Sequence, residues 1–178
     1  MDMGQDDGLD SDCGPMGETA EFMLMSGDTV MELDAGYYKS ASIGDTVWED
    51  MNGNGIQDIG EPGTGGVLVQ LSGSTGSGIV VSRSELTDST GGFMFEDLAP
   101  GSYSLGFVTP VGGYSLTSAD DVDGMEWNDS DASVVLGGIT VVEELSSGEE
   151  NRDYDAGYYR RGGLAPRCRL VTSWGWLS

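Results

Sequence analysis

The twelve residues from Asp50 to Glu61 constrain this chain more than any other stretch. Oxygen-bearing side chains stand at positions one, three, five, nine and twelve of this segment, and a glycine stands at position six. This spacing matches a calcium loop, D-x-[DN]-x-[DN]-G-x5-E. Calcium takes roughly six to eight oxygen ligands, so alternate residues must turn inward and a carboxylate must close the cage. The expected ligands are one backbone carbonyl, that of Ile56, and the side chains of Asp50, Asn52, Asn54, Asp58 and Glu61.

A plain solvated turn is the alternative interpretation, because Asn-Gly pairs are common in tight turns. A turn gives no reason for carboxylates at the first, ninth and twelfth positions, so we favour the calcium loop. Its flanks differ from those of an EF-hand. Residues 43–48 are rich in β-branched and aromatic types, and the glycines and proline of residues 60–66 exclude an exiting helix. The loop is therefore expected between strands, with Gln57 at the eighth position, where EF-hands are usually apolar.

The acidic composition limits the kinds of partner. The chain has 31 Asp and Glu residues, 7 Lys and Arg residues, and a formal net charge of −24. Phosphate binding needs a basic surface, so nucleic acid is not an expected partner. Bound divalent cations would relieve the repulsion among carboxylates, although an acidic surface can also serve solubility alone. We expect no membrane span in this chain, since no apolar run approaches about 20 residues, and no signal-peptide pattern is visible.

Histidine is absent and cysteine occurs twice, which limits the kinds of catalytic and metal site that the chain can form. Without histidine, His-dependent catalytic triads and the usual zinc sites are excluded. Cys13 lies in an acidic stretch and Cys168 in a basic one, and we do not expect them to pair.

An internal repeat sets the domain organisation. The pentapeptide Asp-Ala-Gly-Tyr-Tyr occurs at residues 34–38 and again at residues 155–159. We therefore expect residues 1–40 to be the C-terminal portion of an upstream repeat and residues 43–159 to be one complete module. Residues 160–178 form a basic tail that we expect to be disordered. On this interpretation the chain is a fragment, so the missing signal peptide does not indicate a compartment.

Short apolar segments separated by glycine- and proline-rich turns run through the complete module. Alternation places Val67, Val69 and Leu71 on one face of a strand, and it does the same for the odd-numbered residues 103–107. No segment has convincing helical periodicity, so we expect an all-β sandwich. The expected strands are 43–48, 67–72, 79–83 (a hairpin with 67–72 across a turn at 73–78), 93–95, 103–107, 113–117, 133–136, 139–142 and a closing strand ending at 159.

These segments together resemble a known family. Residues 43–62, 87–95, 98–103 and 155–159 are similar to the B-type repeat of serine-aspartate repeat surface proteins, a calcium-binding family. The resemblance implies a prealbumin-like (Ig-like) β-sandwich with several Ca²⁺ ions per repeat. It also implies tandem arrays that form stalks on secreted or cell-surface, adhesin-like proteins. The expected partners are then neighbouring repeats of the same protein, with an extracellular protein or glycan as a further ligand, and the expected location is extracellular.

A second cation site is expected in the acidic segment at residues 120–131. Its spacing fits no fixed template, and a solvated acidic loop is an equal alternative. The candidate ligands are Asp120, Asp121, Asp123, Asp129 and Asp131.

The sequence favours a structural module stiffened by Ca²⁺ and not an enzyme. Related Cna-type B modules are sometimes cross-linked through a lysine, but residues 43–159 contain none, which leaves calcium as the stiffening agent. No pattern places a pair of carboxylates in an apolar pocket, as glycoside hydrolysis would require. The alternative function is a glycan- or protein-binding β-sandwich accessory domain of a larger secreted enzyme. Its binding platform would be built from the aromatic residues Tyr114, Trp127, Tyr158 and Tyr159.

Overall fold

The described part of the chain contains strands and no helix. The computed structural model describes residues 11–14, 16–31, 33–117, 128–140 and 142–161. Within these ranges no helix is long and apolar enough to cross a membrane. The strands are β1 (Ala41–Ile43), β2 (Val47–Glu49), β3 (Leu68–Thr75), β4 (Val80–Leu86), β5 (Phe95–Leu98), β6 (Gly101–Phe107), β7 (Tyr114–Leu116), β8 (Glu143–Leu145), β9 (Glu150–Asn151) and β10 (Ala156–Arg160).

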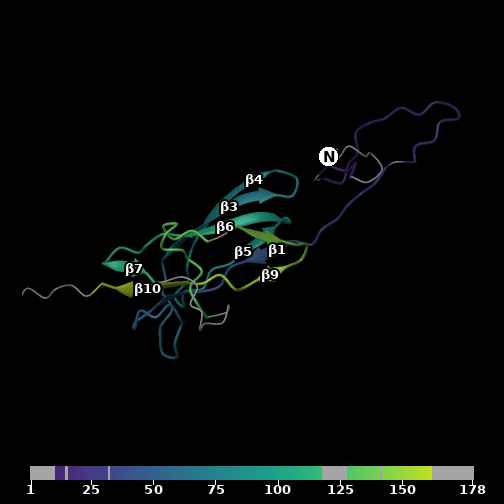
Figure 1. Ribbon diagram of the computed structural model, residues 1–178. Helices are drawn as coiled ribbons and strands as arrows, with labels where there is room; N and C mark the ends of the chain where they lie inside the picture. Colours follow the sequence, from purple (N-terminus) through teal and green to yellow (C-terminus); the bar gives the residue numbers. More distant parts are fainter. Residues whose placement is uncertain (1–10, 15, 32, 118–127, 141, 162–178) are drawn as a thin grey trace, which may run out of the picture.

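The strands form three sheets, which the ribbon shows lying against one another (Figure 1). One sheet has four antiparallel strands in the order β4-β3-β6-β8. The other two have three strands each, in the orders β5-β1-β9 and β2-β10-β7. β1 runs parallel to β9 and β2 runs parallel to β10, so the first strands of the module are paired with its last strands. The predicted all-β sandwich is confirmed.

The core lies between these sheets and is built by strands with alternating burial. On β3, Val69 and Leu71 are at most 1% exposed, and on β6 Tyr103 and Leu105 are fully buried. These are the faces that the alternation of apolar residues predicts. Phe93 packs edge-on against two other rings, with centroids 6.2 Å from Phe95 and 5.5 Å from Phe107. The core therefore mixes aromatic and aliphatic side chains, as on β6, where Leu105 lies between Tyr103 and Phe107.

The prediction of one strand over residues 43–48 is wrong, because the segment contributes to two strands. The chain leaves one sheet after Ile43 and enters another at Val47, so the segment is divided between β1 and β2. Gly44 permits this crossing, because a Cβ there would lie 2.3 Å from the carbonyl oxygen of Phe93. The sequence pattern shows apolar residues at both ends of the segment and does not show which sheet each end joins.

The predicted strand at residues 133–136 is also wrong. These residues turn instead, and Gly137 N donates to Val134 O at 3.2 Å. Gly137 and Gly138 have φ values of 73° and 91°, a region that residues with a side chain rarely adopt. Ile139, in the next predicted strand, makes only isolated bridges, to Gly106 and Ser133.

The predicted hairpin of β3 and β4 is confirmed and is longer than expected. β3 continues through Gly73 to Thr75, whereas the sequence suggested a turn from residue 73 onward. Gly73 faces Tyr103 on β6 so closely that a Cβ would lie 2.2 Å from Ser102 O. The turn is confined to the residues before Ile79 and is closed by a 2.8 Å hydrogen bond from Gly78 N to Thr75 O.

The residues before β1 form no strand in the described ranges and are largely exposed. Tyr37 is 91% exposed, whereas Tyr158, its counterpart in the repeated pentapeptide, is fully buried in β10. This contrast is expected if residues 1–40 end an upstream repeat, which stays a prediction. The segment joins the module at Lys39, whose N–H donates to Ser147 Oγ at 2.9 Å and whose carbonyl accepts from Gly148 N at 3.0 Å.

Candidate metal-binding loop

The loop of residues 50–61 follows β2 directly and is organised by a buried carboxylate. Asp50 is fully buried, and its N–H donates to Tyr158 O on β10 at 2.9 Å. Thr117, the residue after β7, donates its hydroxyl to Asp50 Oδ2. The same carboxylate accepts loop N–H groups from Gly53 at 2.6 Å, Asn54 at 3.3 Å and Gly55 at 3.0 Å. A carboxylate with this many donors fixes the first turn of the loop in one conformation.

Three predicted ligands converge in the middle of the loop. Asn52 Nδ2 lies 2.7 Å from Asp58 Oδ2, and Asn54 Nδ2 lies 3.1 Å from the same oxygen. The oxygens of the two amides accept backbone N–H groups of the loop, Asn52 Oδ1 from Asn54 N and Asn54 Oδ1 from Ile56 N, each at 2.9 Å. Asp58, Asn52 and Asn54 therefore offer one carboxylate and two amide groups to a common point.

Glu61 closes the loop onto its own beginning. Its Oε1 accepts from Met51 N at 2.8 Å, and its Oε2 accepts from Asp58 N at 3.1 Å. Gly55, at the sixth position, has φ of 87°, the left-handed conformation that the motif requires there. Glu61, the last predicted ligand, thus ties the end of the loop to its second residue.

The middle of the loop is paired with the segment that carries the second candidate site. Ile56 forms a bridge with Asp129, and Gln57 N donates to Asn128 O at 2.7 Å. Ser130 N returns a hydrogen bond of 3.1 Å to Gly55 O. The pairing uses backbone groups, which explains why an apolar residue at the eighth position is not needed for contact between the two segments.

The second candidate site is described only in part. Asp120, Asp121 and Asp123 lie outside the described residues, whereas Asp129 is buried and Asp131 is half-buried. Asp131 Oδ2 accepts from Asp155 N at 2.8 Å, and Asp131 N donates to Asp155 O at 2.9 Å. The fold therefore connects this segment to the repeated pentapeptide as well as to the loop of residues 50–61.

Asp155 is a residue of this region that sequence reasoning missed. It is 2% exposed, and its Oδ1 accepts from Thr46 N at 2.9 Å. Burial, together with the nearby charges of Asp45, Asp131 and Asp129, raises the pKa of this carboxyl to about 8. Its repetition as Asp34 was the one available signal, because the pairing of distant strands that buries it is not visible in a local pattern.

The donor set of the loop suits a hard cation. No three His, Cys, Asp or Glu side chains converge to hold a metal among the residues that the structure describes. Loop 50–61 instead combines two amides with the carboxylates of Asp58 and Glu61. Calcium accepts carboxylate, amide and backbone oxygens together, whereas zinc prefers nitrogen and sulfur. The residues present therefore fit calcium better than a transition metal.

The aromatic residues proposed as a ligand platform do not gather on one surface in the described structure. Tyr158 is fully buried in the core. The ring of Tyr114 is covered by Arg160, whose guanidinium carbon lies 5.0 Å from its centroid, and Arg160 is held by Glu49 Oε1 at 3.0 Å. Trp127 lies outside the described residues. This arrangement gives the glycan-binding alternative no support.

Comparison with known proteins gives a consistent result. Residues 41–158 match the family described as the SdrD B-like domain. Serine-aspartate repeat-containing protein E of Staphylococcus aureus (strain USA300) is 36% identical over 141 residues, which is 76% of this chain and 11% of that protein. Serine-aspartate repeat-containing protein F of Staphylococcus epidermidis is 35% identical over 158 residues, 88% of this chain and 8% of that protein. The chain thus spans about a tenth of the length of these relatives.

Proposed function

The chain belongs to the SdrD B-like domain family, and we propose that residues 41–160 act as a calcium-stiffened structural unit in an extracellular, multi-repeat adhesin-like protein. The proposed role is mechanical and not catalytic. Two relatives carry the word repeat in their names, and the internal pentapeptide repeat of this chain supports the same organisation. Binding of an antibody against this module to intact cells of the source organism would test the proposed location.

The cation would be held by the loop of residues 50–61. Calcium would supply positive charge among carboxylates and amides that otherwise face one another. Asp50 and Glu61 hold the ends of the loop, and Asn52, Asn54 and Asp58 present their polar groups between them. Extracellular calcium modules commonly bind with Kd of about 0.1–1 mM, which suits an external site.

The observation that carries this proposal is the closed geometry of the loop. Both carboxylate oxygens of Glu61 return to N–H groups of the loop, one of them at its second residue. A solvated turn of Asn and Gly residues needs no such closure. The twelve-residue spacing and the hydrogen bonds thus support the same function independently.

A bound cation that neutralises the carboxylates of the loop would also stabilise the contacts among β2, β10 and β7. Asp50 links β2 to β10 through its N–H and reaches the end of β7 through Thr117. An ion that binds only the folded loop therefore stabilises the β2-β10-β7 sheet by mass action.

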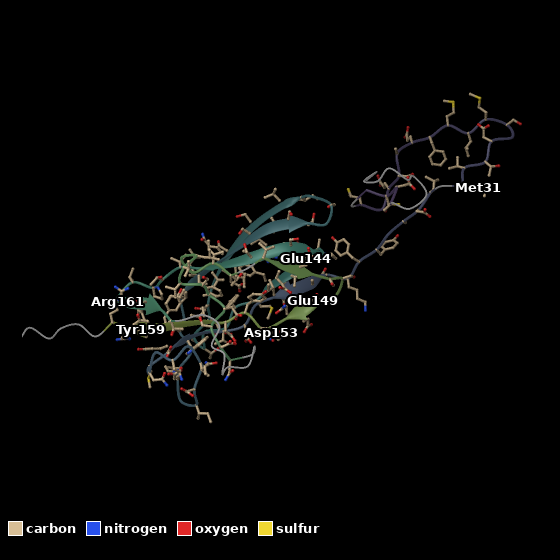
Figure 2. The ribbon with its side chains drawn as sticks, in the orientation of Figure 1. Met31, Glu144, Glu149, Asp153, Tyr159 and Arg161 are labelled. Carbon is tan, nitrogen blue, oxygen red and sulfur yellow. The ribbon has the colours of Figure 1, made fainter. Side chains whose placement is uncertain are left out.

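Contacts at the entry to the module support a rod-like array. Lys39 is bound through both backbone groups to the turn that precedes β9, so the incoming chain has a fixed path. Figure 2 shows Glu149 beside this entry and Arg161 at the far end of the module. Chain entry and exit at opposite ends let successive modules follow one another in line.

Calcium titration by isothermal calorimetry on the full chain, with thermal melts in calcium and in chelator, tests the proposal. Free calcium at about 100 times its Kd should stabilise the fold by about 2.7 kcal/mol, which raises the melting temperature by roughly 10 °C. Asp58→Asn and Glu61→Gln should weaken binding at least about tenfold, because each removes a charged ligand and keeps the shape of the side chain.

A matched control is Glu96→Gln, an exposed carboxylate on β5 outside the loop. It should leave calcium binding unchanged. Equal melting temperatures in calcium and in chelator, with no heat of binding, would show that the loop is only a turn. Loss of binding in Glu96→Gln as large as in Asp58→Asn would show that general negative charge, not the loop, attracts the ion.

A further inference from the structure

β4 forms one edge of the four-stranded sheet, and its outer side has no strand neighbour among the described residues. It lies beside β3 alone in the order β4-β3-β6-β8. The strand contains no proline or glycine, and Val80 and Leu86 at its two ends are 82% and 60% exposed. An exposed edge of this kind is a template for pairing with another strand.

The hydrogen bonds of the hairpin fix which backbone groups of β4 face outward. Thr87 N donates to Val67 O and Thr75 N donates to Ile79 O, each at 2.9 Å. Odd-numbered residues of β4 therefore direct their N–H and C=O groups at β3. Because direction alternates along an antiparallel strand, even-numbered residues direct theirs away from the sheet. These outward residues are Val80, Ser82, Ser84 and Leu86.

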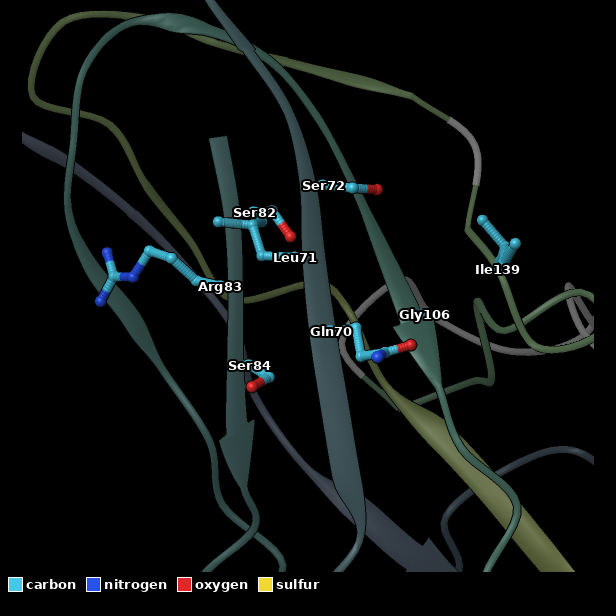
Figure 3. Close-up of a pocket in the computed structure, with 8 residues that line it drawn as sticks. All are labelled: Gln70, Leu71, Ser72, Ser82, Arg83, Ser84, Gly106 and Ile139. Carbon is cyan, nitrogen blue, oxygen red and sulfur yellow. The ribbon is translucent and has the colours of Figure 1, made fainter. Parts of the chain in front are cut away.

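The charged side chains of β4 lie on its inner side. Arg83 points away from Gln70 and Ser72, which stand on the outer face of the sheet (Figure 3). Its Nη1 donates to Glu96 O, and its guanidinium carbon lies 5.7 Å from the ring centroid of Phe95, at the margin beside β5. Glu85 shares this side of the strand and makes no ion pair in the described part of the chain.

We propose that β4 pairs antiparallel with β4 of a second copy of this chain, about a twofold axis through Ser84. Ser84 then stands opposite Ser84 of the copy, and Ser82 stands opposite Leu86. These are the residues whose backbone groups face outward, so they form the hydrogen-bonded pairs. Between them Arg83 stands opposite Glu85 of the copy, twice by symmetry.

Charge selects this register over its neighbours. Moving the axis to Arg83 places two arginines opposite each other, and moving it to Glu85 does the same with two glutamates. Like charges directly opposite each other are destabilising, and opposite charges contribute favourably. An axis that passes between two residues would place even-numbered residues opposite odd-numbered ones. The outward N–H and C=O groups of one strand would then face residues whose own groups point to β3. Only the register through Ser84 pairs the outward backbone groups and also places Arg83 opposite Glu85.

Charge also favours a second copy as the occupant. The chain carries a net charge of −24, so two copies repel over most of their surfaces. β4 carries one positive and one negative residue, and the face beside it is lined by the uncharged residues Gln70, Ser72, Ser82 and Ser84. Inward-pointing charges on an edge strand discourage pairing with an arbitrary strand, because the charges would be covered without a partner. A strand that places an opposite charge beside each of them avoids this cost. A strand of identical sequence supplies them.

Sedimentation equilibrium on the full chain, with Cys13 and Cys168 changed to serine, tests the pairing. The chain should dimerise reversibly, and Arg83→Glu or Glu85→Arg alone should each weaken the dimer about tenfold, because two cross-strand pairs become repulsive. An equimolar mixture of the two single variants should restore association as a heterodimer. The double variant Arg83→Glu/Glu85→Arg should restore the homodimer. This rescue separates the proposal from simple loss of the Arg83 contact with Phe95.

Cross-linking checks the register. Ser84→Cys should form a disulfide-linked dimer under mild oxidation, because paired residues on such strands lie about 5.5 Å apart between Cα atoms. Ser72→Cys, an exposed position on β3 away from the edge, is the control and should react far more slowly. A chain that stays monomeric at about 1 mM, a dimer indifferent to both charge reversals, or equal cross-linking at positions 72 and 84 would overturn the proposal.

Discussion

Asp155 is a carboxylate that the fold holds away from water, and its replacement by asparagine should change how stability depends on pH. The pKa of an unfolded aspartate is about 3.9, whereas that of folded Asp155 is raised to about 8. Between these values the folded chain keeps a proton that the unfolded chain releases. The free energy of unfolding therefore falls as pH rises, by up to about 1.4 kcal/mol per pH unit.

From pH 5 to pH 8 this single group accounts for a loss of about 4 kcal/mol in chelator. Asp155→Asn keeps an oxygen for Thr46 N and resembles the protonated acid in shape, so it should remove most of that loss. The contribution of Asp45, whose pKa is also raised by burial, remains in both proteins. The variant should accordingly be more stable than the wild type at pH 8, by several kcal/mol, and nearly equal to it at pH 4.

Urea unfolding at pH 5, 6, 7 and 8, followed by tryptophan fluorescence, measures how the free energy of unfolding changes with pH in the wild type and in Asp155→Asn. Asp97→Asn is the matched control, because Asp97 is exposed and asparagine tolerates its φ of 56°. Parallel pH profiles for wild type and Asp155→Asn would refute the reasoning. A variant that is less stable at every pH would show instead that the charged form of Asp155 supports the fold.

Three further predictions test other parts of the structure by urea or thermal unfolding. Leu105→Ala empties a fully buried site on β6 and should cost about 2–5 kcal/mol; a cost below 1 kcal/mol would contradict its place in the core. Gly91→Ala and Gly113→Ala have similar φ values, 88° and 85°, but only at Gly91 would the new Cβ lie 2.2 Å from a backbone oxygen, that of Val47. Gly91→Ala should therefore be the more damaging by about 2 kcal/mol or more, and equal losses would point to φ alone. Thr117→Val removes the hydroxyl that donates to buried Asp50 and should cost about 1–3 kcal/mol, whereas Thr117→Ser should cost less; equal costs would assign the effect to packing.

The parts of the fold that the sequence predicts well are those set by local alternation. Leu71 and Leu105 are buried where a period of two places them, since each strand has one face toward the core. The division between β1 and β2 could not be predicted, because the apolar residues Ile43, Val47 and Trp48 do not by themselves show which sheet each of them joins. Which sheet each half joins depends on distant partners, β9 for one and β10 for the other.

The candidate site also has one part that the sequence predicts and one part that it does not. The spacing from Asp50 to Glu61 lies within one loop, so its pattern is readable from the sequence alone. Thr117 reaches Asp50 only because β7 and β2 both pair with β10, and no local rule connects residues so far apart. Asp131 meets Asp155 for a similar reason, through backbone hydrogen bonds between two segments that the fold brings together.

The parallel pairing of the first and last strands determines how the module carries tension. When its two ends are pulled apart, β2 is drawn one way and β10 the other, along their common direction. The hydrogen bonds between Val47–Glu49 and Ala156–Tyr158 are then loaded in shear and must break together, unlike those of an antiparallel hairpin that opens one bond at a time. β1 and β9 repeat this arrangement in a second sheet. Rupture under force is governed by the unfolding rate, so the module resists pulling along its length more than its equilibrium stability alone would indicate.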